Sequence, residues 1–263
     1  MRFPTKPMDP TDTPIDQLSF AAYRLAGEKG RQRPAAFISL AHWFEAEKFR
    51  AFQPDLFEEV MLCPSIKEAR KLATKSKNQW RGDWLAVRVR ALACGMVYAS
   101  RSEPMSTRWH GSAEEIAKFL APLGLPERFL LGAATEYVRL RNASSVAFLG
   151  ANSAPHDIVG KRINLIHKKA ERAWTMLHWQ GRHGCWRVHD WAVSQYIPVV
   201  YAGEDDARVN AQGIAQIGAR CKSVVVFEKR GGKAMDATIR ALRLAKVPVE
   251  LDLYLTDKTE QIS

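Results

Sequence analysis

The feature that most constrains the fold of this chain is a regular alternation of short apolar runs with longer helical patterns in its second half. The apolar runs cover residues 146–149, 174–179, 197–201, 223–227 and 248–254. Helical spacing of apolar residues lies between them, over residues 157–173, 187–195, 209–219 and 234–246. This alternation indicates βαβ units, because a parallel strand pair needs a long crossover, usually a helix. We therefore expect an α/β fold with a Rossmann-like parallel sheet in the C-terminal part.

The first half carries a different pattern, with apolar residues repeating every three or four positions. Leu40, Trp43, Phe44 and Phe49 share one face of a helix predicted over residues 37–52. Further helices are expected over residues 65–75, which begin with a Ser-x-x-Glu capping box, and over residues 84–99. We predict two domains, a mostly α-helical one over residues 1–144 and the sheet domain over residues 145–263.

Composition limits the class of protein further. Hydrophobic residues make up 46% of the chain and the net charge is +11, which suits a folded protein that attracts anionic ligands. The four cysteines are widely separated, so we expect neither a disulfide framework nor a metal site. The chain opens without an apolar leader and contains no run long enough to span a bilayer. We expect a soluble, cytoplasmic protein without a membrane partner or a resident cofactor, and the sequence leaves its oligomeric state open.

Glycines and basic side chains follow three of the expected strands. Glycine allows the backbone to approach an anion closely, and a helix that follows adds the partial positive charge of its N-terminus. A single loop of this kind is common on protein surfaces, but three at successive strand ends predict a phosphate site. The predicted ligand-binding residues in these loops are Gly150, Asn152, Gly181, Arg182, Gly184, Arg230, Gly231, Gly232 and Lys233.

Residues 146–254 resemble the SLOG superfamily of Rossmannoid domains, which includes the DNA-processing protein DprA and the "lonely guy" phosphoribohydrolases. The segments that carry the resemblance are VAFLGAN, LHWQGRHGCWRVHDWAVSQYIPVV and VNAQGIAQIGARCKSVVVFEKRGGKAMDATIRALRLAKVPV. The resemblance implies nucleotide binding and adds Asn210 to the expected ligand contacts. Trp186 stands where relatives have an Asp, and Ala234 and Met235 where they have Gly-Thr. Asp236 is the carboxylate nearest to the place where phosphoribohydrolases have a catalytic acid.

The helix predicted over residues 37–52 places His42 and Glu45 one turn apart, with Glu47 on another face. These side chains are candidates for acid–base catalysis, and His42 and Glu45 could instead be two metal ligands, although an ordinary hydrogen-bonded surface pair is the commoner arrangement. The segments SLAHWFEAEKF, SIKEARKLATK and RGDWLAVRVRAL resemble the NADAR superfamily of N-glycosidases. The active-site Glu of that family falls on Ala41, so the resemblance implies either a diverged member that has lost this chemistry or one in which Glu45 and Glu47 substitute for it.

Basic and aromatic residues also alternate over residues 67–90. Such a surface can contact nucleic acid, with aromatic side chains stacking on bases. A solvated helix face is the alternative explanation. The predicted nucleic-acid contacts are Lys71, Lys75, Lys77, Arg81 and Trp84.

These features lead to three hypotheses about function. The first is an N-glycosidase that acts on a nucleotide or an ADP-ribose-linked base, with Glu45, Glu47 or Asp236 stabilising the oxocarbenium-like transition state. The second is a sensor that binds a nucleotide or an ADP-ribose-like ligand without chemistry. The third is a DNA-associated protein that binds through its positive surface. Ala41, Trp186 and Ala234 favour the second hypothesis over the first.

Overall fold

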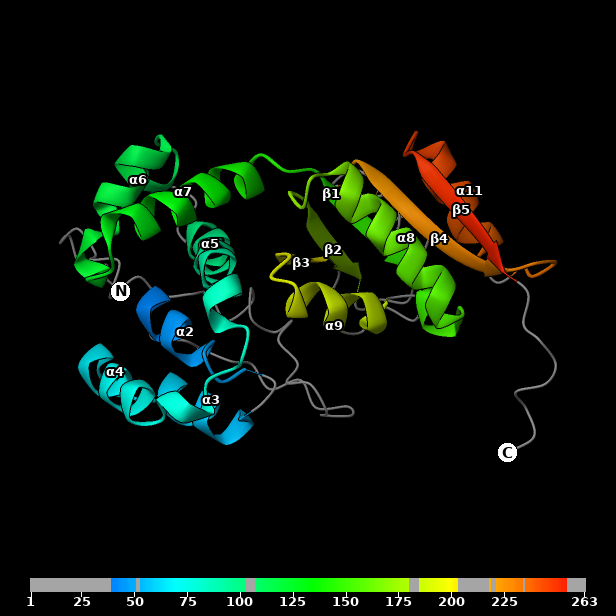
Figure 1. Cartoon of the computed structure of the whole chain (residues 1–263). Helices are drawn as coiled ribbons and strands as arrows, with labels where there is room; N and C mark the ends of the chain where they lie inside the picture. Colours follow the sequence, from blue (N-terminus) through cyan, green and yellow to red (C-terminus); the bar gives the residue numbers. More distant parts are fainter. Residues whose placement is uncertain are drawn as a thin grey trace, which may run out of the picture. The chain divides into compact units, whose positions relative to one another are not determined.

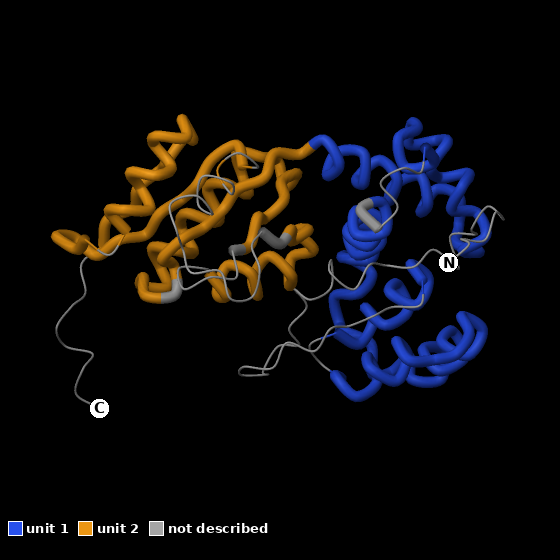
Figure 2. The backbone as a smooth tube through the Cα atoms, turned by 180° about the vertical axis from the view of Figure 1, so that it is seen from behind, with its two compact units in different colours: residues 1–142 blue, residues 143–263 orange. Residues whose placement is uncertain are grey.

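The structure is a computed structural model that describes residues 39–50, 53–102, 107–179, 185–202, 218, 221–233 and 235–254. The chain divides into two compact units, Met1–Asn142 and Ala143–Ser263, coloured blue and orange in Figure 2. The boundary expected at residue 144 lies two residues beyond the end of the first unit.

The described residues of the first unit form helices and short 3-10 turns, and no strand. Its helices are α2 (Leu40–Ala46), α3 (Pro54–Met61), α4 (Ile66–Lys75), α5 (Trp84–Ser102), α6 (Ala113–Phe119) and α7 (Glu127–Arg141), with turns η1 (Lys77–Gln79), η2 (Thr107–Trp109) and η3 (Ala121–Leu123).

Side-chain caps fix where several of these helices begin. The Ser65 hydroxyl accepts a hydrogen bond from the Glu68 amide at the start of α4. Ser112 and Glu115 form a complete capping box at the start of α6, each side chain bonding the backbone of the other. Such caps satisfy backbone donors that have no partner within the helix.

Helix α2 is shorter than the helix predicted over residues 37–52. It ends at Ala46, and residues 47–50 continue as turns. The Phe49 amide bonds the Ala46 carbonyl three residues back, and the Lys48 carbonyl accepts a hydrogen bond from the distant Arg81 amide at 2.7 Å. In a continuing α-helix, the Lys48 carbonyl would accept a hydrogen bond from the amide four residues later. Here it accepts the bond from Arg81 instead.

Trp43 lies at the centre of the packing between α2 and α5. Its indole nitrogen donates to the Ala91 carbonyl at 3.1 Å, and its ring meets Tyr98 edge-on. Gly95 permits this contact, since a Cβ there would lie 2.5 Å from the Trp43 ring. Trp109 has a similar position near α6 and α7, in contact with Phe119 and Tyr137.

The second unit contains a five-stranded sheet in which all the neighbouring strands are parallel. The strands are β1 (Ser145–Leu149), β2 (Thr175–Trp179), β3 (Val199–Ala202), β4 (Ser223–Lys229) and β5 (Val249–Tyr254). Their order across the sheet is β3-β2-β1-β4-β5 (Figure 1). The prediction of an α/β fold with a parallel sheet is therefore confirmed.

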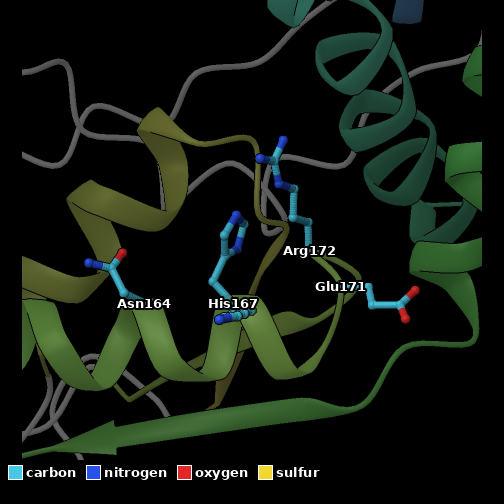
Figure 3. Close-up of a pocket in the computed structure, with 5 residues that line it drawn as sticks. Asn164, His167, Glu171 and Arg172 are labelled. Carbon is cyan, nitrogen blue, oxygen red and sulfur yellow. The ribbon is translucent and has the colours of Figure 1, made fainter.

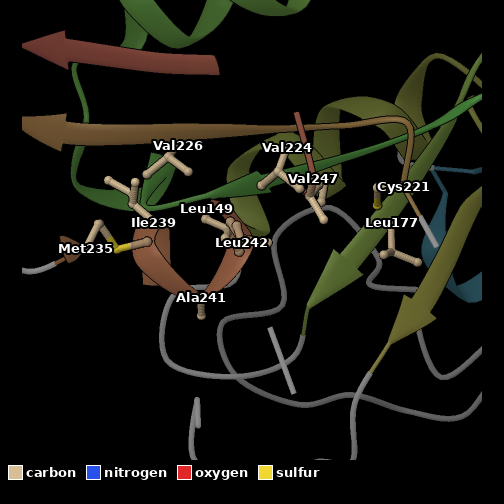
Figure 4. Packing of buried hydrophobic residues seen from close by; sticks show 11 residues of the cluster. Leu149, Leu177, Cys221, Val224, Val226, Met235, Ile239, Ala241, Leu242 and Val247 are labelled. Atoms are coloured by element: carbon tan, nitrogen blue, oxygen red, sulfur yellow. The ribbon is translucent and has the colours of Figure 1, made fainter. Parts of the chain in front are cut away.

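Helices cover both faces of this sheet (Figure 1). Helix α11 (Asp236–Leu244) packs Ile239 and Leu242 on a row of strand residues that includes Leu149, Val224 and Val226 (Figure 4). Helices α8 (His156–Lys169) and α9 (Trp186–Ser194) lie on the other side. A short turn, η4 (Ala151–Ser153), connects β1 to α8.

On the α8 side, contacts tie the helices and the preceding loops to the sheet. Arg162 of α8 forms ion pairs with Glu250 and Asp252 of β5, at 3.0 and 2.8 Å. Phe148 of β1 contacts Trp174, whose ring stacks with that of Trp191 in α9. Both faces of the central strands are thus covered, as apolar runs in a parallel sheet require.

Within the described residues, no helix is both long enough and apolar enough to cross a membrane.

Candidate functional site

The strand order places a reversal between β1 and β4. From β1 the chain moves outward through β2 to β3, and β4 and β5 then lie on the opposite side of β1. Connections that leave two neighbouring strands toward opposite sides open a crevice at their carboxyl ends, where open parallel sheets usually bind ligands. The residues that follow β1 and β4 are therefore the candidate ligand site.

Gly150 brings the end of β1 against β4. Its φ is +74°, in the left-handed region that favours glycine, and a Cβ would lie 2.3 Å from the Phe227 carbonyl oxygen. The register agrees, because Leu149 is paired with Val226 one step earlier in each strand. Glycine is thus required here by the close approach of two backbones.

The last residue of β4 and the four residues after it form a tight, positively charged turn, which we call the β4 loop (residues 229–233). The Gly232 amide bonds the Lys229 carbonyl at 2.8 Å, and Gly231 has a φ of +78°, as expected for the third position of a type II turn. Lys229, Arg230 and Lys233 are all exposed. The β4 loop therefore presents three cationic side chains that an anionic ligand can reach.

Glu228 lies directly before this turn and has the opposite charge and environment. It is 6% exposed, and its Oε1 accepts a hydrogen bond from the Met235 amide at 3.1 Å. Met235 is the residue that precedes the first turn of α11. A buried carboxylate therefore lies at the carboxyl end of β4, bonded to the start of the following helix.

The carboxyl end of β2 carries a cluster of three rings, of which the two histidines are buried and Trp186 is half-buried. His178 of β2 lies 4.4 Å from the Trp186 ring and 4.9 Å from the His189 ring, measured between centroids. Both histidines are completely buried, and His189 Nδ1 lies 3.0 Å from a carboxylate oxygen of Asp190. These rings join the end of β2 to the beginning of α9.

Arg187 links this cluster to the residues after β1. Its guanidinium donates to the Ala154 carbonyl at 2.6 Å. The neighbouring Cys185 accepts a hydrogen bond from the Val188 amide through its sulfur, and burial raises the pKa of its thiol to about 12. Cys185 is consequently a neutral packing residue at physiological pH and not a nucleophile.

The structure places only some of the predicted ligand-binding residues. Gly150, Arg230, Gly231, Gly232 and Lys233 lie at the carboxyl edge of the sheet, as described above. Asp236 is exposed on the first turn of α11. The backbone of Asn152 lies in η4, and its side chain is not among the parts of the chain that the structure describes. The predicted contacts outside the described residues are Gly181, Arg182, Gly184 and Asn210.

Comparisons with protein-family models, curated proteins and solved structures gave no match. The interpretation of the site therefore rests on its geometry. Over the described ranges, no group of three or more His, Cys, Asp or Glu side chains is arranged to hold a metal ion.

The catalytic candidates of the first unit are buried inside it. The exposed fractions are 2% for His42, 6% for Glu45 and 0% for Glu47, so the interpretation of His42 and Glu45 as a surface pair is wrong. His42 Nδ1 lies 2.9 Å from the hydroxyl of Ser39, the N-cap of α2.

Both candidate glutamates have cationic partners within their own unit. Glu45 forms an ion pair with Lys48, and Arg70 Nε lies 3.9 Å from its other oxygen. Glu47 Oε2 lies 3.3 Å from Arg50 Nη1. Lys48 and Arg50 are themselves buried, at 8% and 6% exposed. Buried charges are tolerated when they are paired in this way, which indicates a structural role for these carboxylates.

Two of the predicted nucleic-acid contacts require correction. Trp84 is 4% exposed and packs against Phe44 with 5.1 Å between ring centroids, so it cannot stack on a base. Arg81 is 9% exposed and bonds both carboxylate oxygens of Asp83, at 2.5 and 2.8 Å, which holds the pKa of Asp83 below its usual value. Lys71, Lys75 and Lys77 are exposed, as a solvated helix face also requires.

A separate hollow of about 390 Å³ lies beside the last turns of α8. Figure 3 shows His167 and Arg172 on the same side of the helix; Asn164, Lys168 and Glu171 complete the lining. The hollow lies where α8 leads back to the start of β2, at the amino edge of the sheet. It is therefore distinct from the crevice at the carboxyl ends.

Sequence reasoning missed several residues that the fold brings to the carboxyl edge. Glu228 is marked in the sequence by a charge at the end of the apolar run 224–227, and His178 stands near the end of another such run. Trp186, Arg187 and His189 lie at the start of α9 and carry no spacing signal of their own, because the topology of the sheet brings them together.

Proposed function

We propose that the second unit is a Rossmann-like domain of the SLOG type that binds a phosphorylated nucleoside, a nucleotide or an ADP-ribose-like molecule, at the crevice between β1 and β4. The observation that carries this proposal is the reversal of strand order there, with the tight Gly150 turn on one side and the cationic β4 loop on the other. Topological reversals of this kind are the usual ligand sites of open parallel sheets.

The charges support an anionic ligand. Arg230 and Lys233 are exposed in the β4 loop, where they can form charge-assisted hydrogen bonds with phosphate oxygens. The net charge of +11 raises the local concentration of anions around the protein as a whole. A phosphate group on the ligand uses both features.

Binding without hydrolysis is favoured over N-glycosidase activity. Stabilising an oxocarbenium-like transition state requires a carboxylate that can approach the sugar. Glu47 has no exposed surface, and Glu45 is buried in an ion pair with Lys48. We propose that the NADAR-like segments of the first unit serve its packing, and that the protein acts as a nucleotide sensor.

The test is a binding screen of the full chain against nucleoside monophosphates, NAD, ADP-ribose and short DNA, by thermal shift and calorimetry. A ligand that binds only the folded state raises the apparent stability. We expect a nucleotide to stabilise the chain and to be recovered intact by mass spectrometry. A nucleotide that loses its base would show an enzyme, and stabilisation by DNA alone would overturn the proposed site.

Matched variants locate the bound anion. Arg230→Ala and Lys233→Ala each remove one cation from the β4 loop, and each is expected to weaken nucleotide binding about tenfold, the effect of about 1.4 kcal/mol. Lys222→Ala is the control, because Lys222 is an exposed lysine beside the amino end of the same strand. Equal losses for Lys222 and Lys233 would show that binding depends on net charge and not on this site.

A further inference from the structure

We propose that Glu228 determines the specificity of this site by accepting hydrogen bonds from the hydroxyl groups of a ribose. This inference rests on the proposed function and names a feature of the ligand, namely a phosphorylated ribose with its hydroxyls unmodified. Its basis is a difference between Glu228 and the other buried glutamates of the chain.

The position of Glu228 along its strand calls for an apolar side chain. Val224 and Val226 point to the same face of β4 and lie in the core beneath α11. Successive side chains of a strand alternate between faces, so Glu228 continues this row. It is 6% exposed, comparable with the residues of that core. A carboxylate therefore replaces a core residue at the point where the row reaches the crevice.

The carboxylate is only partly satisfied by the protein. A buried carboxylate needs hydrogen bonds or a counter-ion to offset its lost hydration. Among the described residues, Glu228 has one hydrogen bond, from the Met235 amide to Oε1, and no cation within ion-pair distance. Glu45 and Glu47 are equally buried, and each is paired with a cation. Glu228 thus keeps capacity to accept hydrogen bonds from another molecule.

The glycine that follows leaves one side of the carboxylate without a covering side chain. A Cβ on Gly232 would lie 3.6 Å from Glu228 Oε1 and 2.9 Å from the Lys229 carbonyl oxygen. A side chain at this position would therefore be in contact with the carboxylate. Gly232 is itself exposed, and in this proposal a ligand held by the β4 loop reaches Glu228 past this residue.

The cations of the β4 loop and the carboxylate of Glu228 would contact different parts of the ligand. An ionised carboxylate accepts hydrogen bonds and repels phosphate, while Arg230 and Lys233 only donate. The phosphate of a bound nucleotide therefore faces the outward cations, and neutral donors face Glu228. Ribose hydroxyls are such donors, and a carboxylate at a strand end commonly binds them in dinucleotide-binding folds.

The experiment compares ribose and deoxyribose ligands on the full chain by calorimetry. The probes are AMP, 2′-deoxy-AMP and 3′-deoxy-AMP, with GMP included to detect recognition of the base. Wild-type protein is expected to bind AMP about tenfold or more tighter than at least one of the deoxy ligands, the usual effect of a hydrogen bond to a charged group.

Glu228→Gln tests the residue itself. The amide oxygen can still accept the Met235 hydrogen bond, while the amide nitrogen cannot accept one from a hydroxyl. We expect the variant to bind AMP more weakly than wild type and without preference over the deoxy ligands. Its affinity for the deoxy ligands should be unchanged or stronger. Glu171→Gln is the matched control, because it makes the same change at an exposed glutamate near the amino edge of the sheet and should keep the preference.

The outcomes separate this inference from the proposed function. Equal wild-type binding of AMP and both deoxy ligands would leave nucleotide binding intact and overturn the role of Glu228, whether or not the variant folds. A preference for GMP over AMP that Glu228→Gln removes would also overturn it, in favour of base recognition. Failure of every ligand to bind wild-type protein would reject the proposed function and the inference together.

Discussion

Buried glutamates occur in both units, and their surroundings differ. In the first unit, Glu45 and Glu47 are paired with Lys48 and Arg50, so positive and negative charges balance inside the fold. In the second unit, Glu228 is buried without a cationic partner among the described residues, while the cations of the β4 loop face the solvent. Glutamates and cations are therefore paired with one another in the first unit, whereas in the second unit Glu228 and the cations of the β4 loop can still contact another molecule.

This difference teaches that the location of counter-ions indicates a site better than the residue types do. A His–Glu pair at helical spacing and a glutamate after an apolar run are both plain in the sequence. Only the fold reveals that Glu45 of the first pair is held in ion pairs and that Glu228 lies at the carboxyl end of β4 beside an exposed cationic turn. This contrast between paired and unpaired buried glutamates can be tested by substitution and labelling, with effects that range from large to small.

The largest effect is expected when one partner of a closed pair is removed. Glu47→Ala removes the carboxylate that pairs with the buried Arg50 guanidinium, and the free energy of unfolding should fall by about 3–5 kcal/mol. The measurement is urea unfolding of the full chain. Asp157→Ala is the control, because its pair with Lys161 is exposed and should contribute less than about 1 kcal/mol. Similar losses for the two variants would contradict the distinction between closed and open charges.

Gly150 and Gly231, the glycines with positive φ in the described part of the second unit, distinguish the effect of packing from that of backbone conformation. Gly150→Ala adds a Cβ that would lie 2.3 Å from the Phe227 oxygen, and the loss of stability should be about 3 kcal/mol. Gly231→Ala has a similar φ but open space around it, and should lose about 1 kcal/mol. Thermal unfolding of both variants measures the difference. Equal losses would mean that β1 and β4 tolerate separation at this point.

Cysteine labelling tests burial in both units. Burial raises the pKa of the Cys94, Cys185 and Cys221 thiols to about 12, whereas Cys63 is partly exposed. At pH 8, a thiol reagent should modify Cys63 at least about a hundredfold faster than the other three, because these must first be exposed by unfolding. The site of modification is read by peptide mass spectrometry.

The direction of the pH effect follows from the same shifts. A raised thiol pKa means that the folded state favours the neutral form, so this contribution to stability is complete below pH 9 and is lost as the pH rises toward 12. Ionisation of the three buried thiols should therefore weaken their protection in alkali. Rapid labelling of Cys94 at pH 8 would show that the first unit opens readily.

The smallest effect is expected on the exposed face of the first unit. With Arg81 and Trp84 buried, the remaining predicted nucleic-acid contacts are Lys71, Lys75 and Lys77. Replacing all three with alanine should change stability by less than about 0.5 kcal/mol and weaken any DNA binding only through charge. The salt dependence of DNA affinity measures this effect. A large loss of DNA affinity at fixed salt would support a specific nucleic-acid interface at these lysines.

Much of the second unit could be predicted from its sequence. The apolar run 146–149 is one residue shorter than β1 (Ser145–Leu149), and the run 248–254 differs from β5 (Val249–Tyr254) by one residue at its start. Strands buried on both faces are apolar almost throughout, which makes them visible without knowledge of their partners. The ends were less well predicted: β4 continues through Glu228 to Lys229, where charged side chains hide the strand.

The site could be predicted only in part, because its neighbours are distant in sequence. Gly150 is recognisable as a turn residue, but its contact with Phe227 depends on the pairing of β1 with β4. The role of Arg81 was likewise hidden: its amide bonds the Lys48 carbonyl and its side chain folds onto Asp83. Local patterns predict elements, whereas the burial of a charge is decided by long-range packing.

Under the proposed function, the contact between Gly150 and Phe227 also bears on how tightly a nucleotide is bound. Because the two backbones touch, the spacing between the turns that follow β1 and β4 is set when the sheet forms. An incoming molecule then does not have to order these strand ends, so less of its interaction energy is lost to restricting the chain. Affinity here is consequently coupled to the integrity of the central strand pair, even for substitutions that never meet the ligand.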